Sequence, residues 1–252
     1  MNYTAPWWLP GGNLQTIWSA TCARTTLQNQ WAKPQWRRER WATPDVDFVD
    51  VDFLVSTSSS PSRSSDGRRP LLVLFHGLEG SSASHYVRAF AAVAAARGWQ
   101  MAVPHFRDCS GEINRAARAY HSGDFKEVHW LLERFAQLQP EALYAVGVSL
   151  GGNALMRWAG TLGAQAAPLA DRVVAICAPL DLTASGQAID RGFNRQIYAR
   201  MFLRSMVPKA LAKWEQFPGL FDRERLLAAR DLHSFDDVFT APLHGFKDAD
   251  EY

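Results

Sequence analysis

Gly147-Val148-Ser149-Leu150-Gly151-Gly152 joins the apolar run of residues 142–148 to the helix-favouring run of residues 153–158. A serine flanked by glycines at a sharp turn from strand to helix follows the G-x-S-x-G pattern, which exposes a serine side chain at the edge of a sheet. Glycine is needed at 147 and 151 because side chains there would meet the neighbouring strand or helix. The pattern also occurs in ordinary turns, but this context favours Ser149 as a nucleophile.

A second signal lies upstream, where residues 71–75 form a continuous apolar run. Such a run is typical of a strand that is buried on both faces of a parallel sheet. It leads directly into the loop His76-Gly77-Leu78-Glu79-Gly80-Ser81-Ser82. A loop of this kind can supply backbone N–H groups to the oxyanion that forms when a serine attacks a carbonyl carbon. We expect these groups to be the N–H of Leu78 and that of Leu150, the residue after the nucleophile.

Strand and helix patterns alternate along the central part of the chain. The expected strands are two segments within residues 40–55 at a half-exposed edge, then 71–75, 100–104, 142–148 and 172–178; the expected helices are 82–97, 124–138 and 153–158. The helix at 124–138 is the clearest, since apolar residues recur at helical spacing and Asp124 is a suitable N-cap. The alternation predicts an α/β fold with a mostly parallel sheet and helices on both faces. Ligands bind such sheets at the carboxyl ends of the strands.

Several local expectations follow from the same patterns. The helix at residues 82–97 should bury a stripe of Val87, Phe90 and Val93. The strand at residues 172–178 should be buried, which makes Cys177 a small core residue. Residues 56–70, rich in Ser, Pro and Arg, should form a surface loop.

The chain is expected to be one domain of residues 1–252: an amino-terminal arm at 1–39, a core sheet at 40–180 and a helical lid region at 181–252. Beyond Pro179 the sequence has many aromatic residues, helix-like stretches at 193–206 and 208–216, and no convincing strand. These helices could cover the active site and line an acyl pocket. A helical layer without substrate contact is an equally good interpretation.

Composition excludes several functional classes. With 27 basic and 25 acidic residues the net charge is +2, which gives no reason to expect nucleic acid as a partner. The basic run at residues 37–40 is interrupted by Glu39 and is best interpreted as a solvated face. Three cysteines are too few and too scattered for a disulfide framework or a zinc site. With no export signal and no apolar run long enough to cross a bilayer, we expect a cytoplasmic protein without a transmembrane segment.

Six blocks of the sequence closely resemble the YheT-like α/β-hydrolases, bacterial relatives of the eukaryotic ABHD1/ABHD3-type lipases and the yeast medium-chain ester synthases. The blocks extend from residue 6 to residue 249, and are Pro6-Trp7-Trp8-Leu9-Pro10-Gly11-Gly12-Asn13-Leu14-Gln15-Thr16-Ile17, His76-Gly77-Leu78-Glu79-Gly80-Ser81-Ser82, Phe106-Arg107-Asp108-Cys109-Ser110-Gly111-Glu112, Arg118-Ala119-Tyr120-His121-Ser122-Gly123, Gly147-Val148-Ser149-Leu150-Gly151-Gly152-Asn153 and Thr240-Ala241-Pro242-Leu243-His244-Gly245-Phe246-Lys247-Asp248-Ala249. Together they are far more specific than the serine motif alone.

The resemblance implies a serine esterase that acts on small acyl esters, or an enzyme that transfers the acyl group to an alcohol. Ser149 would form an acyl-enzyme, and the Leu78 and Leu150 N–H groups would hold the oxyanion. Neither a metal nor an organic cofactor is required. The sequence gives no indication of the oligomeric state.

One departure from the family pattern affects the expected activity. In this fold the catalytic acid and histidine follow the serine in the chain, on loops after the last strands. After Ala178 we find neither those strands nor a matching acid and histidine, so we expect a chain that is truncated at its carboxyl end and lacks the last strands. The strand at residues 172–178 would then be an unpaired edge. A catalytically impaired hydrolase, or a remnant that only binds acyl ligands, is the alternative function.

Other ionisable residues are weaker candidates for the chemistry. His233 and His244 are the histidines that follow the turn at Ser149, and Asp181 lies where some hydrolases keep their acid. We expect loop-shaping hydrogen bonds from three further histidines, at positions 76, 105 and 121. A local ion pair without a chemical role is expected among three charged residues of one loop, Arg107, Asp108 and Glu112.

Overall fold

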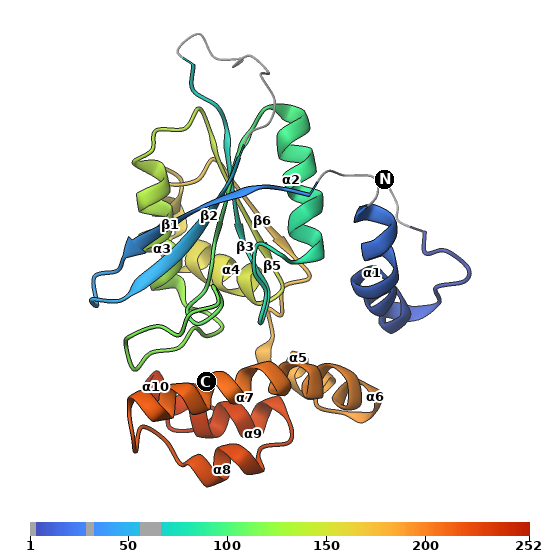
Figure 1. The fold of residues 1–252 in the computed structure, drawn as a ribbon, viewed down its shortest axis with the longest axis vertical. Helices are drawn as coiled ribbons and strands as arrows, with labels where there is room; N and C mark the ends of the chain where they lie inside the picture. Colours follow the sequence, from blue (N-terminus) through green and yellow to red (C-terminus); the bar gives the residue numbers. More distant parts are fainter. Residues whose placement is uncertain (1–3, 29–32, 56–66) are drawn as a thin grey trace.

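The computed structural model describes residues 4–28, 33–55 and 67–252. At its centre is a six-stranded sheet in the order β1-β2-β4-β3-β5-β6 (Figure 1). The strands are β1 (Trp36–Ala42), β2 (Phe48–Leu54), β3 (Leu71–Phe75), β4 (Gln100–Pro104), β5 (Leu143–Val148) and β6 (Arg172–Ile176). Strand β3 pairs in parallel with β4 and β5, and β5 with β6. Strands β1 and β2 add an antiparallel edge, so the predicted mostly parallel α/β sheet is confirmed.

Helices cover both faces of the sheet, as the alternating pattern predicts (Figure 1). Helix α2 (His85–Arg97) lies on one face, and α3 (Phe125–Ala136) and α4 (Leu150–Leu162) lie on the other. Successive residues of a strand point to opposite faces. Accordingly Leu72 and Leu74 belong to the core under α2, whereas Val73 belongs to the core under α3 and α4. Asp124 caps α3 as predicted, because its carboxylate accepts a hydrogen bond from the backbone N–H three residues later.

Strand β1 begins four residues earlier than the sequence predicts, because its basic residues pair with acids of β2. Arg38 lies opposite Asp52 and Arg40 lies opposite Asp50 in the antiparallel register. Each arginine makes two hydrogen bonds to its carboxylate, at 2.7 and 2.9 Å for Arg38 and at 2.8 and 2.9 Å for Arg40. The run at residues 37–40 is therefore a half-exposed strand face that neutralises buried acids.

Two burial predictions are wrong. Strand β6 is not buried: Val173 packs against the core, but Val174 and Ile176 point to the other face and are 47% and 37% exposed. Cys177 follows the end of this edge strand and is exposed, so it is not a core residue. The stripe predicted for α2 is wrong only in part: Val87 is buried with Ala91 and Ala94 on one helical face and Phe90 packs against that core, whereas Val93 lies off that face and is exposed.

Helices after β6 form a layer across the carboxyl ends of the parallel strands (Figure 1). They are α5 (Leu182–Ile189), α6 (Gly192–Asn194), α7 (Arg200–Gln216), α8 (Arg223–Ala228), α9 (Leu232–Phe235) and α10 (Ala241–Leu243), with π-helical turns at Arg195–Ala199 and Asp236–Thr240. The sequence predicts a break before Pro208, but α7 continues through it, since the next turns bury Ala210 and Lys213. No described residue after Ile176 lies in a strand.

The amino-terminal segment stands apart from the sheet (Figure 1). Its helix α1 (Gly11–Gln28) contacts the later helices through a hydrogen bond of 3.2 Å from the Tyr198 hydroxyl to Asn13 Oδ1. The predicted surface loop at residues 56–70 lies mostly outside the described residues. The division of the chain into an arm, a core and a lid region stays a prediction.

Candidate active site

Ser149 occupies the turn between β5 and α4 with φ +52° and ψ −119°. The left-handed region is rarely adopted by residues other than glycine, and such strain persists only where the surroundings hold it. Here the Ser149 N–H donates to the Ile176 carbonyl at 2.9 Å, and the Ser149 carbonyl accepts from the Asn153 N–H at 2.9 Å. Both bonds tie the strained residue to its neighbouring elements.

The glycines around Ser149 permit this close packing. A Cβ atom added to Gly147 would lie 2.4 Å from the carbonyl oxygen of Gly151. One added to Gly151 would lie 2.4 Å from the carbonyl oxygen of Phe75, at the end of β3. The sequence-based reason for glycine at both positions is therefore confirmed.

The loop after β3 lies directly against Ser149. A Cβ added to Gly77 would be 3.2 Å from the Cβ of Ser149. Residues 77–80 form a turn in which the Gly80 N–H donates to the Gly77 carbonyl at 2.9 Å. The Gly77 N–H donates to the Tyr86 hydroxyl at 2.9 Å, and the Glu79 N–H to the Tyr120 hydroxyl at 3.1 Å.

Two backbone N–H groups next to Ser149 have no hydrogen-bond acceptor among the described residues. One belongs to Leu78, the single residue of the 77–80 turn whose N–H is not engaged. The other belongs to Leu150, the first residue of α4, where N–H groups have no partner within the helix. Leu78, Ser149 and Leu150 all line the same cavity. Two free donors beside a serine can bind an oxygen that becomes negative during a reaction.

His76 holds the turn in shape, as expected from the sequence. Its Nε2 accepts a hydrogen bond of 3.0 Å from the Phe106 N–H, so the ring proton of the neutral imidazole is on Nδ1. Nδ1 then donates to the Gly77 carbonyl at 2.8 Å. The ring is fully buried, and this burial, with smaller contributions from His105 and Lys209, lowers the pKa of His76 to about 3. His76 is therefore neutral at physiological pH.

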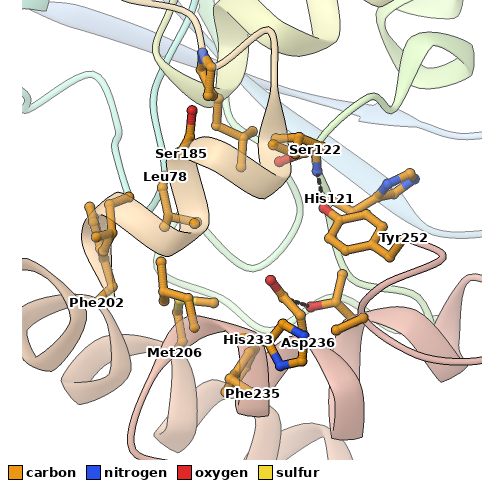
Figure 2. Close-up of a pocket in the computed structure, with 18 of the residues that line it drawn as sticks. Leu78, His121, Ser122, Ser185, Phe202, Met206, His233, Phe235, Asp236 and Tyr252 are labelled. Atoms are coloured by element: carbon orange, nitrogen blue, oxygen red, sulfur yellow. Dashed lines mark hydrogen bonds between the residues drawn. The ribbon is translucent and has the colours of Figure 1, made fainter. Parts of the chain in front are cut away.

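A cavity of about 610 Å³ separates the carboxyl edge of the sheet from the helices after β6. Its size is within the usual range for a site that binds a small molecule. Leu78 from the sheet side and Phe202, Met206 and Phe235 from the helices point into it (Figure 2). Further apolar lining comes from Leu182, Ile189 and Phe239.

Polar groups line the remaining wall of the cavity (Figure 2). The Ser122 N–H donates to the Tyr252 hydroxyl at 2.7 Å. Asp236 lies in the second π-helical turn and accepts a hydrogen bond of 2.5 Å from the Thr240 hydroxyl. Burial raises the pKa of Asp236 to about 7, against the lowering effect of that bond.

Histidines line the cavity, but no described histidine is hydrogen-bonded to the serine hydroxyl. His121 lines the cavity and packs against His244, with 3.9 Å between ring centroids and 38° between ring planes. Burial lowers the pKa of both, that of His244 to about 3. His233 also lines the cavity and pairs with Asp250 at 3.0 Å. Within residues 4–28, 33–55 and 67–252, no side chain hydrogen-bonds to the Ser149 hydroxyl.

Asp181, the position considered for a catalytic acid, caps helix α5: its side chain accepts from the Ala184 N–H at 2.8 Å. His105 has the expected loop-shaping contacts, with Nε2 at 2.9 Å from Asp52 and Nδ1 at 3.2 Å from the Cys109 carbonyl.

The predicted local ion pair in the loop after β4 is wrong. Its charged residues pair with partners from distant segments: Arg107 with Asp45, Asp47 and Glu127, Asp108 with Lys213, and Glu112 with Arg40. Because the β1–β2 hairpin and α7 fold onto this loop, non-local partners replace the adjacent ones. Sequence reasoning also missed Glu79, Lys209 and Asp236 as cavity residues, and no local pattern marks them.

A family model described as alpha/beta hydrolase fold matches residues 70–230. The chain belongs to the α/β-hydrolase family. It is 39% identical over 216 residues to the protein named "Putative esterase YheT" of Escherichia coli, covering 83% of this chain and 60% of that protein. The predicted YheT-like resemblance is thereby confirmed.

A yeast protein is a more distant relative. The chain is 30% identical over 210 residues to "Medium-chain fatty acid ethyl ester synthase/esterase 2" of Saccharomyces cerevisiae, covering 73% of this chain and 46% of that protein. The solved carboxylesterase EstE1, cloned from a metagenomic library, aligns with a TM-score of 0.47 at 11% identity, over 77% of this chain and 66% of that one. The chain spans about three fifths of the bacterial relative and less than half of the yeast relative. Among the described helices, none is both long and apolar enough to span a membrane.

Proposed function

We propose that this site hydrolyses carboxylic esters that have an acyl chain, with Ser149 as the nucleophile. The observation that carries the proposal is the pair of unengaged N–H groups, on Leu78 and Leu150, that flank a strained serine at an apolar cavity. Donors in fixed positions are worth more to a developing negative charge than to a neutral ground state. The family relationship supports the same chemistry.

In the proposed reaction, Ser149 Oγ attacks the ester carbonyl carbon and the C=O electrons move to the oxygen. The resulting oxyanion accepts hydrogen bonds from the Leu78 and Leu150 N–H groups. The serine proton passes to solvent water, and the alkoxide expelled when this intermediate collapses takes up a proton and leaves as the alcohol. Water then attacks the acyl group left on Ser149, which releases a carboxylic acid and returns a proton to Ser149 Oγ. The apolar side chains of the cavity, such as Phe202 and Met206, would hold the acyl chain.

Ser149 must lose its hydroxyl proton during the attack, and no described side chain is hydrogen-bonded to that group. We assign no triad acid or histidine within this chain. Loss of a triad member typically lowers turnover by about 10⁴ to 10⁶, and the remaining rate enhancement comes from the oxyanion donors and binding. We therefore expect slow turnover from these 252 residues.

Hydrolysis of p-nitrophenyl esters with acyl chains of increasing length tests the proposal. The protein should release p-nitrophenol faster than buffer alone, with a preference among chain lengths, and Ser149→Ala should abolish the difference. Equal rates for the two proteins would contradict a serine esterase. The second candidate function is binding of acyl ligands without turnover, and the observation that favours it is the lack of a described side chain hydrogen-bonded to the serine hydroxyl. Equal rates together with binding of a fluorescent fatty acid by both proteins would support this function.

An alcohol could replace water as the acyl acceptor at the same site. Addition of ethanol to the assay should then yield an ethyl ester, detectable by mass spectrometry, at the expense of the free acid. The cytoplasmic location expected from the sequence stays a prediction.

A further inference from the structure

Glu79 has an unusual backbone conformation next to the free Leu78 N–H. It is the second central residue of the 77–80 turn and has φ +56°. A turn with positive φ at this position favours glycine or asparagine. A glutamate there is strained, and strain of this kind persists where the surrounding structure imposes it. The side chain of Glu79 should therefore contribute something that glycine could not.

Tyr120 holds Glu79 by two groups at once. Its hydroxyl accepts from the Glu79 N–H at 3.1 Å and donates to Glu79 Oε1 at 2.8 Å. The Tyr120 ring is itself fixed by stacking on Phe106, with 5.7 Å between centroids and 14° between planes. The two hydrogen bonds thus connect the backbone of the turn to a rigid part of the core.

Lys209 adds a contact from the helices that cover the cavity. It lies in α7, and its Nζ is 2.9 Å from both carboxylate oxygens of Glu79. The Glu79 side chain is only 10% exposed, which limits screening of this ion pair by water. Glu79, Tyr120 and Lys209 all line the cavity that contains Ser149. The turn next to the nucleophile is therefore linked directly to α7.

The direction of the Leu78 N–H depends on the shape of this turn. That N–H and the Gly77 carbonyl belong to one planar trans peptide, so they point in opposite directions. The Gly77 carbonyl is held by the Gly80 N–H at 2.9 Å and by His76 Nδ1 at 2.8 Å. If Glu79 relaxed to a negative φ, the turn would open and the Leu78 N–H would rotate.

We propose that Glu79, Tyr120 and Lys209 are positioning residues that keep the Leu78 N–H aimed at the reacting carbonyl oxygen of the substrate. The proposal rests on the function proposed above and extends it to the helices over the cavity. The oxyanion site is then complete only when α7 is packed in place, with Lys209 paired to Glu79. A purely structural role, in which the ion pair only attaches α7 to the core, is the alternative.

The rate at which a fluorophosphonate modifies Ser149 separates these roles, because the phosphonyl oxygen takes the place of the ester oxyanion. Tyr120→Phe removes both hydrogen bonds to Glu79, and Lys209→Met removes the ion pair. Each should lower the maximal modification rate about tenfold or more, while the inhibitor concentration for half-maximal rate changes by less than about twofold. Lys209→Arg, which keeps the charge, should restore most of the rate.

Arg225→Met is the matched control, since it removes another ion pair of the helical region, that with Asp237 at 2.8 Å, which does not line the cavity. Its maximal rate should equal that of the wild type. Unchanged maximal rates in both Tyr120→Phe and Lys209→Met, or a change confined to the half-maximal concentration, would overturn the proposal. Thermal melts of all variants identify any that fail to fold. Lys209→Met should lower the thermal midpoint without preventing folding, because the Glu79 carboxylate keeps its hydrogen bond from the Tyr120 hydroxyl.

A wild-type protein that is not modified would contradict the proposed function rather than the positioning role. The role is then decided by the ¹⁵N-leucine NMR signal of the Leu78 amide, assigned by its loss in Leu78→Val. Tyr120→Phe and Lys209→Met should shift or broaden this signal, and Arg225→Met should not. A signal that stays in place in the first two variants would overturn the proposal.

Discussion

The buried His76 imidazole should make the protein sensitive to mild acid. Burial lowers its pKa from 6.5 to about 3 in the folded protein, while the unfolded chain keeps the ordinary value. Below pH 6.5 the unfolded state therefore binds a proton that the folded state does not, and this favours unfolding. The contribution to stability is fully present above pH 6.5 and is lost as the pH falls toward 3.

The size of the effect follows from the two pKa values. The unfolded imidazole is about one quarter protonated at pH 7 and almost fully protonated at pH 5. Folding stability should fall by about 2 kcal/mol between these pH values on account of this one residue. Other ionisable groups also titrate in this range, so the contribution of His76 has to be isolated by a comparison of two proteins.

His76→Asn provides that comparison. Asparagine can still donate an N–H to the Gly77 carbonyl, but it does not titrate and it leaves the Phe106 N–H without its acceptor. At pH 7 the variant should be less stable by about 1–3 kcal/mol, the cost of an unsatisfied buried donor. Urea unfolding at both pH values should show the gap between the two proteins shrinking by about 2 kcal/mol at pH 5. A gap that is the same at pH 5 and pH 7 would refute a buried neutral histidine.

Three further substitutions test the packing. Gly151→Ala should lower the thermal midpoint, because its Cβ would lie 2.4 Å from the Phe75 carbonyl oxygen, and overpacking of this kind costs about 1–3 kcal/mol or more. Trp158→Ala, at a fully buried residue of α4, should cost about 3–5 kcal/mol in urea unfolding. Lys213→Met should cost about 3–5 kcal/mol at pH 7, since it leaves the buried Asp108 carboxylate without its cation. Burial raises the pKa of Asp108, so this loss should diminish at acid pH as the carboxyl group takes up a proton.

Each of these three predictions would be contradicted by a specific result. A Gly151→Ala protein as stable as the wild type would show that β3 and α4 do not meet as closely as described. A loss of less than about 1 kcal/mol for Trp158→Ala would place this side chain outside the core. A cost for Lys213→Met that does not change with pH would remove Asp108 as the partner of Lys213.

Local patterns in the sequence predict most of the sheet and the position of Ser149. Three of these patterns each depend on a single element or turn: the apolar run of β3, the amphipathic spacing of α3 and the glycines around Ser149. The structure confirms all three. The prediction that β6 is buried is wrong because it, too, uses a pattern within one element. An apolar run does not show whether the strand has neighbours on both sides, and among the described residues β6 pairs with β5 alone.

Contacts between distant segments could not be predicted. Glu79 lies 41 positions before Tyr120 and 130 positions before Lys209 in the chain, so these contacts arise only from the tertiary fold. The charged residues of the loop after β4 are likewise paired with other segments, although adjacent partners were available. Positive φ at Glu79 is also invisible in the sequence, because glutamate is not a residue that normally indicates such a turn.

We propose that Ser149 is a correctly placed nucleophile beside two free oxyanion donors. Intact mass measurement after exposure to a fluorophosphonate, followed by peptide mapping, tests it most directly. We predict a single slow adduct on Ser149 that is absent from Ser149→Ala. A folded protein that gains no adduct, or gains it at another residue, would contradict the claim.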